Sequence, residues 1–247
     1  MGKTFEALMQ AERERQERLE ENHLAPPPND LLLKEFDIPF QIVEEYHRME
    51  YKISNMYPKR TSKVILFVSP NEGEGNSTVL TQFGITLALG GNRVLLVDTN
   101  LRRPSIHRLF DLPGEKGLTD LILKKYDLKE TIKNTSLQNL RVITSGNNHT
   151  EAIPILTFSV FDSAIEKMKS EADWILFDAP PIHVSNDAIA LAPKVDGVII
   201  VIKAEKTRWE VAQNVRQRIE SGKGNILGVV LNERRFYIPE WLYQRLG

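Results

Sequence analysis

The sequence predicts an α/β fold: a mostly parallel, doubly wound sheet with helices on both of its faces. Three observations predict it. After residue 63, short continuous apolar runs rich in β-branched residues alternate with helical stretches, which is typical of parallel strands buried on both faces. The length of 247 residues suits one large domain of this kind. Apolar residues make up 41% and charged residues 26% of the chain, as in proteins that bury a core.

Charge and cysteine content exclude several classes of protein. The 32 Lys plus Arg residues balance 33 Asp plus Glu residues, so no overall field draws the chain to nucleic acid or to an anionic membrane. There is no cysteine, which excludes disulfide scaffolds, thiolate zinc sites and cysteine nucleophiles. The longest apolar runs, residues 64–68 and 198–202, are far shorter than the ~20 residues of a spanning helix. We therefore expect a cytoplasmic protein with no segment inserted in a membrane and no nucleic-acid partner.

Two helices are expected before the first strand. Residues 4–22 form a mostly charged helix, which residues 25–30 (APPPND) stop because proline lacks a donor and clashes with the preceding turn. Residues 1–30 are therefore predicted to be a helical arm with a Pro-rich linker, and residues 31–247 the α/β domain. The arm is interpreted either as a floppy tail or as a docking helix for a partner. A second helix is expected over residues 39–56.

Six strands and the helices between them make up the predicted domain. Right-handed crossovers place the connecting helices on both faces of a parallel sheet. Any ligand then binds at the carboxyl ends of the strands. The expected strands are residues 64–69, 93–98, 140–144, 174–178, 197–202 and 226–231.

The first strand runs into a loop that contains two glycines, SPNEGEGNST (residues 69–78), and a helix over residues 77–89 follows. Glycines let main-chain N–H groups close around an anion, and the helix N-terminus adds partial positive charge. In this phosphate loop, Ser77 would give a hydroxyl to Mg²⁺ and Thr78 would contact a phosphate oxygen. The motif requires lysine at the position of Asn76, and the alternative is a glycine turn with a serine cap. The candidate nucleotide-binding residues are Gly73, Glu74, Gly75, Asn76, Ser77 and Thr78.

Two further strands end in aspartate, at Asp98 and Asp178. A carboxylate at such a strand end lies at the sheet edge where the Mg²⁺ of a bound nucleotide would sit. A single aspartate there is usually a helix cap, whereas two of them beside a phosphate loop favour a metal site. The expected Mg²⁺ ligands are Ser77, Asp98 and Asp178, and Asp98 is also the candidate catalytic residue.

The segment VLLVDTNLRRPSIHRLFDL (94–112), with the phosphate loop before it and ILFDAPP (175–181) after it, resembles the bacterial tyrosine kinases of capsule and exopolysaccharide synthesis. The resemblance runs from about residue 40 to residue 232, and residues 102–110 are its most specific part. It implies a three-layer P-loop NTPase-like fold that binds ATP and Mg²⁺ and autophosphorylates a C-terminal tyrosine cluster. It also implies a membrane polysaccharide co-polymerase or related export component as partner, and a position near the adenine for Asn232.

Three positions in the expected site depart from the family pattern. Asn76 stands where the family has lysine, and Asn100 stands where it has the second carboxylate of an Asp-x-Asp motif. Ala179 follows Asp178 where a hydroxyl residue is common. Loss of one preorganised donor in a charge-stabilising site typically lowers the rate about 10²–10³-fold. The sequence therefore predicts a catalytically impaired relative, and binding of ATP or ADP with Mg²⁺ stays open.

The regions for assembly and for the phosphorylated tail also depart from the family. Its ring-forming helix carries Glu-x-x-Arg-x-x-Arg, which aligns with Glu44, His47 and Glu50, so a ring of that type is not expected, and a homo-oligomer stays open. The tail holds Tyr237 and Tyr243 but no tyrosine cluster. The leading hypothesis is a regulator or scaffold of exopolysaccharide polymerisation and export, associated with the membrane through its partner.

Two other functions remain as alternatives. In the first, the chain is an active autokinase or ATPase in which Arg102 or Arg103 supplies the positive charge that Asn76 lacks. Arg102 is therefore also a candidate nucleotide-binding residue. A third hypothesis is a deviant ATPase that positions cargo on membranes or DNA. The near-neutral charge and Asn71 at the alternative signature-lysine position both count against it.

Overall fold

The computed structural model describes residues 38–147 and 159–234. The predicted helix over residues 4–22, the arm and linker over residues 1–30, and the tail tyrosines Tyr237 and Tyr243 lie outside the described residues. By its internal contacts the chain divides into the units Met1–Ile42 and Val43–Gly247. All strands belong to the second unit.

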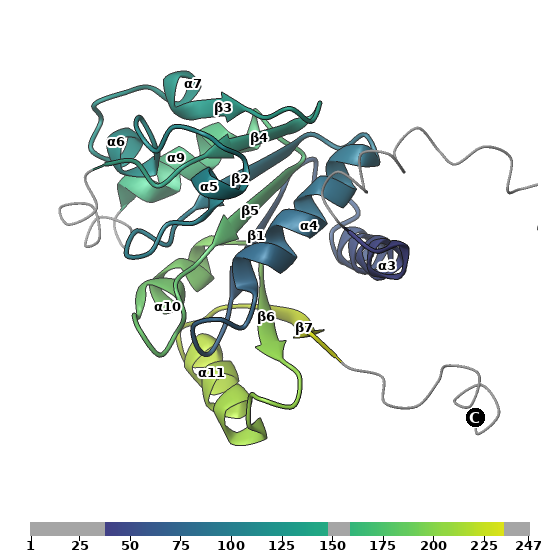
Figure 1. Ribbon diagram of the computed structural model, residues 1–247. Helices are drawn as coiled ribbons and strands as arrows, with labels where there is room; N and C mark the ends of the chain where they lie inside the picture. The colour runs from purple at the N-terminus through teal and green to yellow at the C-terminus, as the bar shows by residue number, and fades with distance from the viewer. Residues whose placement is uncertain (1–37, 148–158, 235–247) are drawn as a thin grey trace, which may run out of the picture. The chain divides into compact units, whose positions relative to one another are not determined.

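The sheet has seven strands in the order β3-β4-β2-β5-β1-β6-β7 (Figure 1). Every pairing is parallel except that of β3 with β4, so the predicted mostly parallel sheet is confirmed. The number of strands is a correction, because six were predicted. The additional strand has three residues and no apolar run, which is why the sequence did not reveal it. The strands are β1 (Lys63–Val68), β2 (Val94–Asp98), β3 (Ile132–Asn134), β4 (Leu140–Ile143), β5 (Trp174–Asp178), β6 (Gly197–Lys203) and β7 (Ile226–Asn232).

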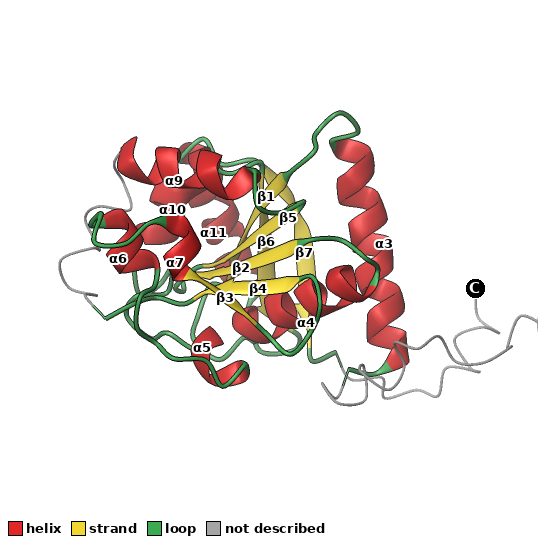
Figure 2. Cartoon of the chain, turned by 90° about the horizontal axis from the view of Figure 1, so that it is seen from above, coloured by secondary structure: helices red, strands yellow, loops and turns green. Residues whose placement is uncertain are grey.

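Helices cover both faces of the sheet, as the alternating pattern predicted. Helix α4 lies against one face, with α3 beside it, and α9, α10 and α11 lie on the other (Figure 2). The predicted helices over residues 39–56 and 77–89 correspond to α3 and α4, each with its first residue shifted by one. The α-helices are α3 (Phe40–Met56), α4 (Asn76–Leu89), α5 (Ile106–Leu109), α6 (Leu118–Ile122), α7 (Leu128–Thr131), α9 (Ser159–Lys169), α10 (Asp187–Leu191) and α11 (Trp209–Ser221).

Helix α4, which starts at the phosphate loop, is buried on nearly all sides. Phe83 at its middle packs against Phe67 of β1 and Trp174 of β5, with ring centroids 6.0 and 5.7 Å away. On the side away from the sheet, Tyr46 of α3 contacts the Phe83 ring and donates its hydroxyl hydrogen to Oε1 of Gln82 over 3.0 Å. Because α4 is packed between the sheet and α3, its first turn is held in a fixed position.

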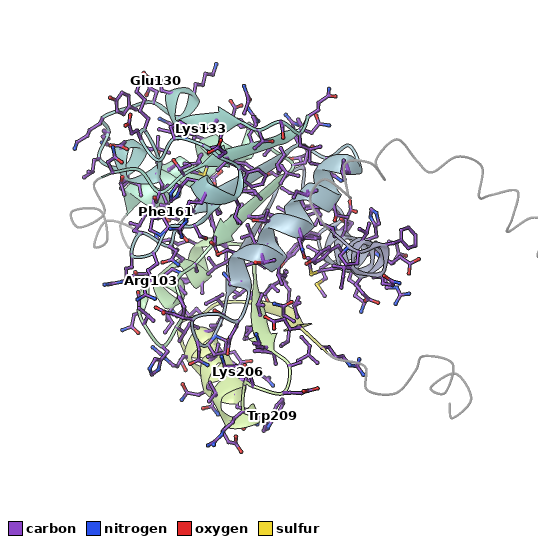
Figure 3. The ribbon with its side chains drawn as sticks, viewed as in Figure 1. Arg103, Glu130, Lys133, Phe161, Lys206 and Trp209 are labelled. Carbon is purple, nitrogen blue, oxygen red and sulfur yellow. The ribbon has the colours of Figure 1, made fainter. Side chains whose placement is uncertain are left out.

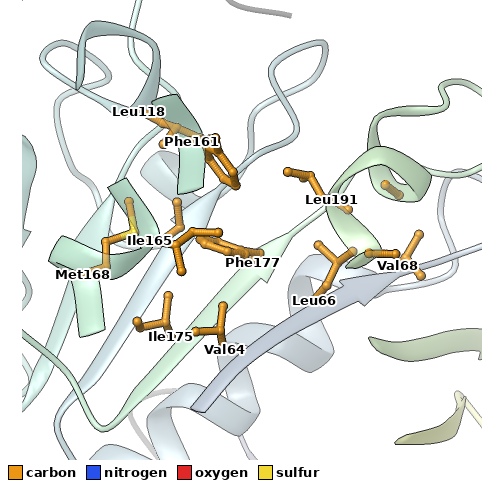
Figure 4. Close-up of a cluster of buried hydrophobic side chains, with 14 of the residues drawn as sticks. Val64, Leu66, Val68, Leu118, Phe161, Ile165, Met168, Ile175, Phe177 and Leu191 are labelled. Atoms are coloured by element: carbon orange, nitrogen blue, oxygen red, sulfur yellow. The ribbon is translucent and has the colours of Figure 1, made fainter. Parts of the chain in front are cut away.

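The opposite face carries the main hydrophobic cluster, drawn in Figure 4. Alternate β1 residues Val64, Leu66 and Val68 join α9 and α10 side chains in it. Phe161 of α9 packs on Phe177 of β5 at 5.6 Å between centroids. Strand β1 lies inside the sheet between β5 and β6 and is buried on both faces. Its carboxyl end is therefore a rigid base for the loop that follows.

The sheet order brings together strands that are far apart in the sequence. Strands β2 and β5 are neighbours, and their register sets Asp98 directly opposite Asp178. Strand β1 lies on the other side of β5, with Phe67 opposite Asp178. The ends of β1, β2 and β5 thus meet at one edge, as a doubly wound topology requires.

Candidate functional site

The phosphate loop depends on two glycines with left-handed backbones. Gly73 has φ 73° and Gly75 has φ 86°, a region that L side chains rarely adopt. A Cβ at Gly75 would also lie 2.1 Å from Nδ2 of Asn232. That amide donates a 3.0 Å hydrogen bond to the carbonyl of Glu74. Asn232, predicted to lie at the nucleotide, therefore supports the loop from the end of β7.

The Glu74 carboxylate is buried inside the loop. It accepts hydrogen bonds from the main-chain N–H and the side-chain amide of Asn71, at 3.2 and 3.0 Å. Thr207 donates a third from its hydroxyl, at 2.6 Å. Thr207 stands between Lys206 and Trp209, both labelled in Figure 3, in the turn from β6 into α11. The carboxylate is thus engaged within the protein, and a nucleotide would meet the main chain of Glu74. No pattern in the sequence pointed to Thr207.

Asn76, at the lysine position of the motif, is only 8% exposed and is directed at the sheet. Its Nδ2 donates to the carbonyl of Phe67 at 3.0 Å and to Oδ1 of Asp178 at 2.7 Å. Its Oδ1 has no hydrogen-bond partner among the described residues. The amide therefore bridges the ends of β1 and β5 and leaves one buried acceptor unsatisfied.

The predicted magnesium ligands lie together. Ser77 donates its hydroxyl hydrogen to Oδ2 of Asp178 at 2.6 Å. Ser105 in turn donates its hydroxyl hydrogen to Oγ of Ser77 at 3.0 Å. Thr78, in the same first turn of α4, is exposed, which leaves its hydroxyl accessible to a ligand. Both oxygens of Asp178 are thus occupied by the loop, one by Asn76 and one by Ser77.

Asp98 is completely buried and is held by main-chain groups. Its Oδ1 accepts the N–H of Asn100 at 3.1 Å, and its Oδ2 accepts those of Ser105 and Ile106 at 3.0 and 3.1 Å. The side chain of Asn100 faces away, since its Oδ1 accepts the N–H of Arg103 at 3.2 Å. Ser105 was not among the predicted site residues, although it lies in the most specific stretch of the family resemblance, residues 102–110.

The two carboxyl groups are both fully buried, side by side at the strand ends. Burial and the charge of Asp178 raise the pKa of Asp98 to about 8, against the opposing effect of its three N–H donors. Burial likewise raises the pKa of Asp178 to about 6, against the donors Ser77 and Asn76. Two adjacent buried carboxylates without a cation favour retention of a proton.

The arginines predicted as substitute cations are both engaged by acids. Nε of Arg102 lies 3.7 Å from Oδ2 of Asp187, at the start of α10. Arg103, labelled in Figure 3 on the loop after β2, pairs with Glu72 of the phosphate loop. Arg102 is thus directed to α10, whereas Arg103 brings a guanidinium to the phosphate loop.

These residues fit part of a site for nucleotide phosphates with Mg²⁺. The glycine cradle and the first turn of α4 are those of an anion-binding loop, and Ser77, Asp98 and Asp178 supply hard oxygen atoms. In the part of the chain that the structure describes, no group of three or more His, Cys, Asp or Glu side chains forms a metal site. Mg²⁺ would therefore need phosphate oxygens or water to complete its ligands. One part of such a site is missing: Asn76 stands where the loop would carry a positively charged lysine side chain.

The comparison with family models identifies the fold and its relatives. Residues 62–226 match the family model described as an AAA domain. Tyrosine-protein kinase CpsD of Streptococcus agalactiae serotype III is 30% identical over 191 residues, which cover 77% of this chain and 82% of that protein. This chain belongs to the family of bacterial tyrosine kinases. The putative tyrosine-protein kinase CapB of Staphylococcus aureus is 29% identical over 192 residues, 78% of this chain and 84% of CapB.

Solved structures agree with the family assignment. The chimerical protein CapA2B2 superimposes with a TM-score of 0.73 at 25% identity, over 78% of this chain and 85% of its own. MinD of Pyrococcus horikoshii, solved with Mg-ADP, superimposes with a TM-score of 0.61 at 22% identity, over 75% of this chain and 77% of its own. The three-layer P-loop NTPase-like fold is thereby confirmed for this bacterial tyrosine kinase relative.

Proposed function

We propose that this chain is a catalytically impaired bacterial tyrosine kinase relative. In this proposal it acts in exopolysaccharide or capsule synthesis and export, as a regulator or scaffold of a membrane co-polymerase. One observation carries the proposal. The amide of Asn76 stands at the lysine position and is bound to Asp178 and to the carbonyl of Phe67.

The retained residues would hold ATP or ADP with Mg²⁺. Gly73 to Thr78 would surround the phosphates, and Ser77, Asp98 and Asp178 would face the metal ion, which when bound neutralises phosphate charge. Phosphoryl transfer depends almost wholly on positioning and on such charges. An amide at position 76 supplies no positive charge, and loss of one preorganised donor typically costs about 10²–10³ in rate. The proposed site therefore binds nucleotide without efficient turnover.

The proposed location is the cytoplasm, with access to the membrane through the partner. Among the described residues, no helix has the length and apolarity needed to cross a bilayer. The partner would be a polysaccharide co-polymerase or a related export component. We further propose that residues 1–30 are an arm separate from the domain over residues 31–247.

Side-chain contacts at two positions of the family's ring-forming motif support a function that does not need such a ring. His47 and Glu50 stand where the family pattern has arginines, and Nδ1 of His47 lies 3.4 Å from Oε2 of Glu50. The other oxygen of Glu50 accepts a 3.0 Å hydrogen bond from Asn92, in the loop that follows α4. These side chains are engaged within their own domain.

The test is an assay of the full chain with ATP and Mg²⁺, following phosphotyrosine and released phosphate together. We expect no turnover above that of Asp98→Ala. Calorimetric titration with ADP, with and without Mg²⁺, separates binding from chemistry. Robust turnover that disappears in Asp98→Ala would refute the impaired state.

A second candidate function is an active autokinase or ATPase that uses an arginine as its cation. The pairing of Arg103 with Glu72 favours it, because it brings a guanidinium to the phosphate loop. This candidate requires Arg103→Ala, or Arg102→Ala, to abolish turnover, while Asn76→Lys changes it only modestly. Equal background rates in all these variants would leave the impaired relative as the better proposal.

A further inference from the structure

An open groove of about 660 Å³ lies between α10 and α11, which are neighbours in both views of the chain (Figures 1 and 2). Its apolar lining comes from Ile189 and Ala190 of α10. Gly222, just after α11, lies so close to α10 that a Cβ there would be 2.8 Å from Cγ2 of Ile189. The polar lining carries amide, hydroxyl and guanidinium groups and no carboxylate. It consists of Asn186, Asn214, Gln217, Arg218 and Ser221.

Arg218 is the positive side chain of this groove, and neutral groups hold it in place. One terminal nitrogen donates to the carbonyl of Ile182 at 3.2 Å, in the loop after β5, and the other donates to Oδ1 of Asn186 at 2.7 Å. A guanidinium has five N–H donors, so these two bonds leave donors for a ligand. Because its planar fork is already positioned, Arg218 loses little conformational freedom when it binds an anion.

The acids near the groove are paired with other bases. Asp187, which follows Asn186, lies beside Arg102. Glu220, one turn from Arg216 on α11, accepts a 2.8 Å hydrogen bond from it. Within the described ranges 38–147 and 159–234, no carboxylate forms an ion pair with Arg218. Its positive charge is therefore not compensated inside the protein, and an anionic ligand is the partner that the local charge favours.

The polar residues that α11 contributes form one stripe along the helix. Asn214 is followed at three, four and seven positions by Gln217, Arg218 and Ser221, which is the spacing of side chains on one helical face. Seven residues of helix span about 10 Å, the length of about three residues of extended chain. Carboxamides both donate and accept hydrogen bonds, as the N–H and C=O groups of a peptide require. The stripe thus matches a short extended peptide.

We propose that this groove binds an extended acidic segment of a partner protein. A carboxylate of the segment pairs with Arg218, and its main chain forms hydrogen bonds with the carboxamides of Asn214 and Gln217. The groove carries a single positive side chain, which balances one Asp or Glu carboxylate and not a doubly charged phosphate. The inference goes beyond the proposed function and does not rest on nucleotide binding.

The test is titration of the ¹⁵N-labelled full chain, without nucleotide, with the peptide acetyl-Ala-Ala-Glu-Ala-Ala-amide. NMR follows the Nε–H of Arg218 and the side-chain amides of Asn214 and Gln217, and we expect saturable shifts of these signals. The same peptide with Gln in place of Glu keeps the shape and loses the charge. We expect it to bind at least about tenfold more weakly, as for the loss of a hydrogen bond between charged groups. Acetate supplies a carboxylate without a main chain and should also bind more weakly.

Two variants locate the binding in the groove. Arg218→Gln removes the positive charge, and we expect its affinity for the Glu peptide to fall at least about tenfold. Asn214→Asp places a negative charge at an exposed position of the stripe, and it should weaken binding even if Arg218→Gln does not fold. Arg216→Gln is the matched control, because Arg216 is on the same helix, is paired with Glu220 and does not line the groove. It should bind like the unchanged protein.

The proposal is overturned if millimolar Glu peptide leaves the groove signals unshifted, or if the Gln peptide binds as tightly. Equal affinity for acetate and for the Glu peptide would mean that the groove takes a free carboxylate and no peptide segment. A loss in Arg216→Gln as large as that in Arg218→Gln would assign the effect to the general charge of α11. The dispersion of the main-chain signals establishes that each variant is folded.

Discussion

The amide of Asn76 donates a 2.7 Å hydrogen bond to Oδ1 of Asp178, 102 positions later in the sequence. It joins the lysine position of the phosphate loop to the strand end expected to hold the metal. Ser77 occupies the other oxygen of the same carboxylate. The loop and the Asp178 carboxylate therefore form one hydrogen-bonded unit.

Removal of this amide should lower stability. In Asn76→Ala, Asp178 keeps only the hydroxyl of Ser77 as a side-chain donor, and the carbonyl of Phe67 loses a partner. We expect the free energy of unfolding to fall by about 1–3 kcal/mol, the range for a hydrogen bond to a buried charged group. Urea denaturation at neutral pH measures it. A change below about 0.5 kcal/mol, the level of ordinary surface substitutions, would mean that the bond adds nothing.

The two loop glycines should differ in their sensitivity to a methyl group. Both have positive φ, so alanine strains either backbone by about 1 kcal/mol. Only at Gly75 would the methyl also strike Asn232, while a Cβ at Gly73 meets nothing within 4 Å. We expect Gly75→Ala to be the more destabilising, and Asn232→Ala to recover part of the difference in the double variant. Equal losses at both glycines would argue against the close approach of Asn232.

The hydrogen bond between Glu74 and Thr207 should hold the phosphate loop to the turn before α11. Thr207→Val removes the hydroxyl with little change of shape and leaves a buried carboxylate short of one donor. We expect a loss of about 1.5–3 kcal/mol in urea denaturation. Thr207→Ser keeps the hydroxyl and serves as the matched control, with most of the stability retained. A loss in Thr207→Ser as large as that in Thr207→Val would show that keeping the hydroxyl does not keep the stability, and would contradict the expected contribution of this hydrogen bond.

The sequence was sufficient for the fold and for the main-chain part of the site. Continuous apolar runs revealed the six longer strands. Strands β1, β2, β5 and β6 are almost entirely buried, whereas the edge strand β7 is partly exposed and was revealed by its apolar residues alone. Strand-terminal Asp98 and Asp178 followed from the same runs. The three-residue β3 was missed because it has no such run. Side-chain direction was also beyond sequence reasoning: Asn76 was expected among the nucleotide-binding residues, but its amide donates to Asp178 and to the carbonyl of Phe67. Thr207 could not be found because its role arises only from the contact between two loops.

Stability should depend on pH through the paired carboxyl groups. The pKa of Asp98 is raised to about 8 and that of Asp178 to about 6, so the folded state binds more protons than the unfolded state. Stability is then highest at the acid end of this range and falls as pH rises from about 4 to about 8. We expect the unfolding temperature to fall by a few °C between pH 6 and pH 8.5.

Asp98→Asn should at least halve the fall in unfolding temperature between pH 6 and pH 8.5. The substitution removes one protonation site and the repulsion between the carboxylates of Asp98 and Asp178. Asp173→Asn is the control. Hydrogen bonds from Arg93 lower the pKa of Asp173, so its contribution is present throughout pH 6–8.5 and is lost only at acid pH. A slope unchanged by Asp98→Asn, or equally changed by Asp173→Asn, would contradict the assignment.

Truncation of Phe83, on the α4 side of the sheet, should be costly. It is fully buried and contacts the rings of Tyr46, Phe67 and Trp174. Phe83→Ala is expected to cost about 3–5 kcal/mol, and Phe83→Leu markedly less because most of the volume remains. Chemical denaturation measures the free energy of unfolding of both variants. Near-equal values for Phe83→Ala and Phe83→Leu would mean that the surrounding side chains fill the cavity left in Phe83→Ala.

The neighbouring positions of β2 and β5 also have a consequence for biosynthesis. Asp98 leaves the ribosome about eighty residues before Asp178, and β1 needs β5 as a partner as well. Until residue 178 has emerged, the nascent chain holds a glycine loop and a lone carboxylate with nothing to pair them. Long-range pairings of this kind form late and slowly in folding. Ligand binding at these strand ends would therefore require the central sheet to be complete, and we expect none in a chain cut before β5.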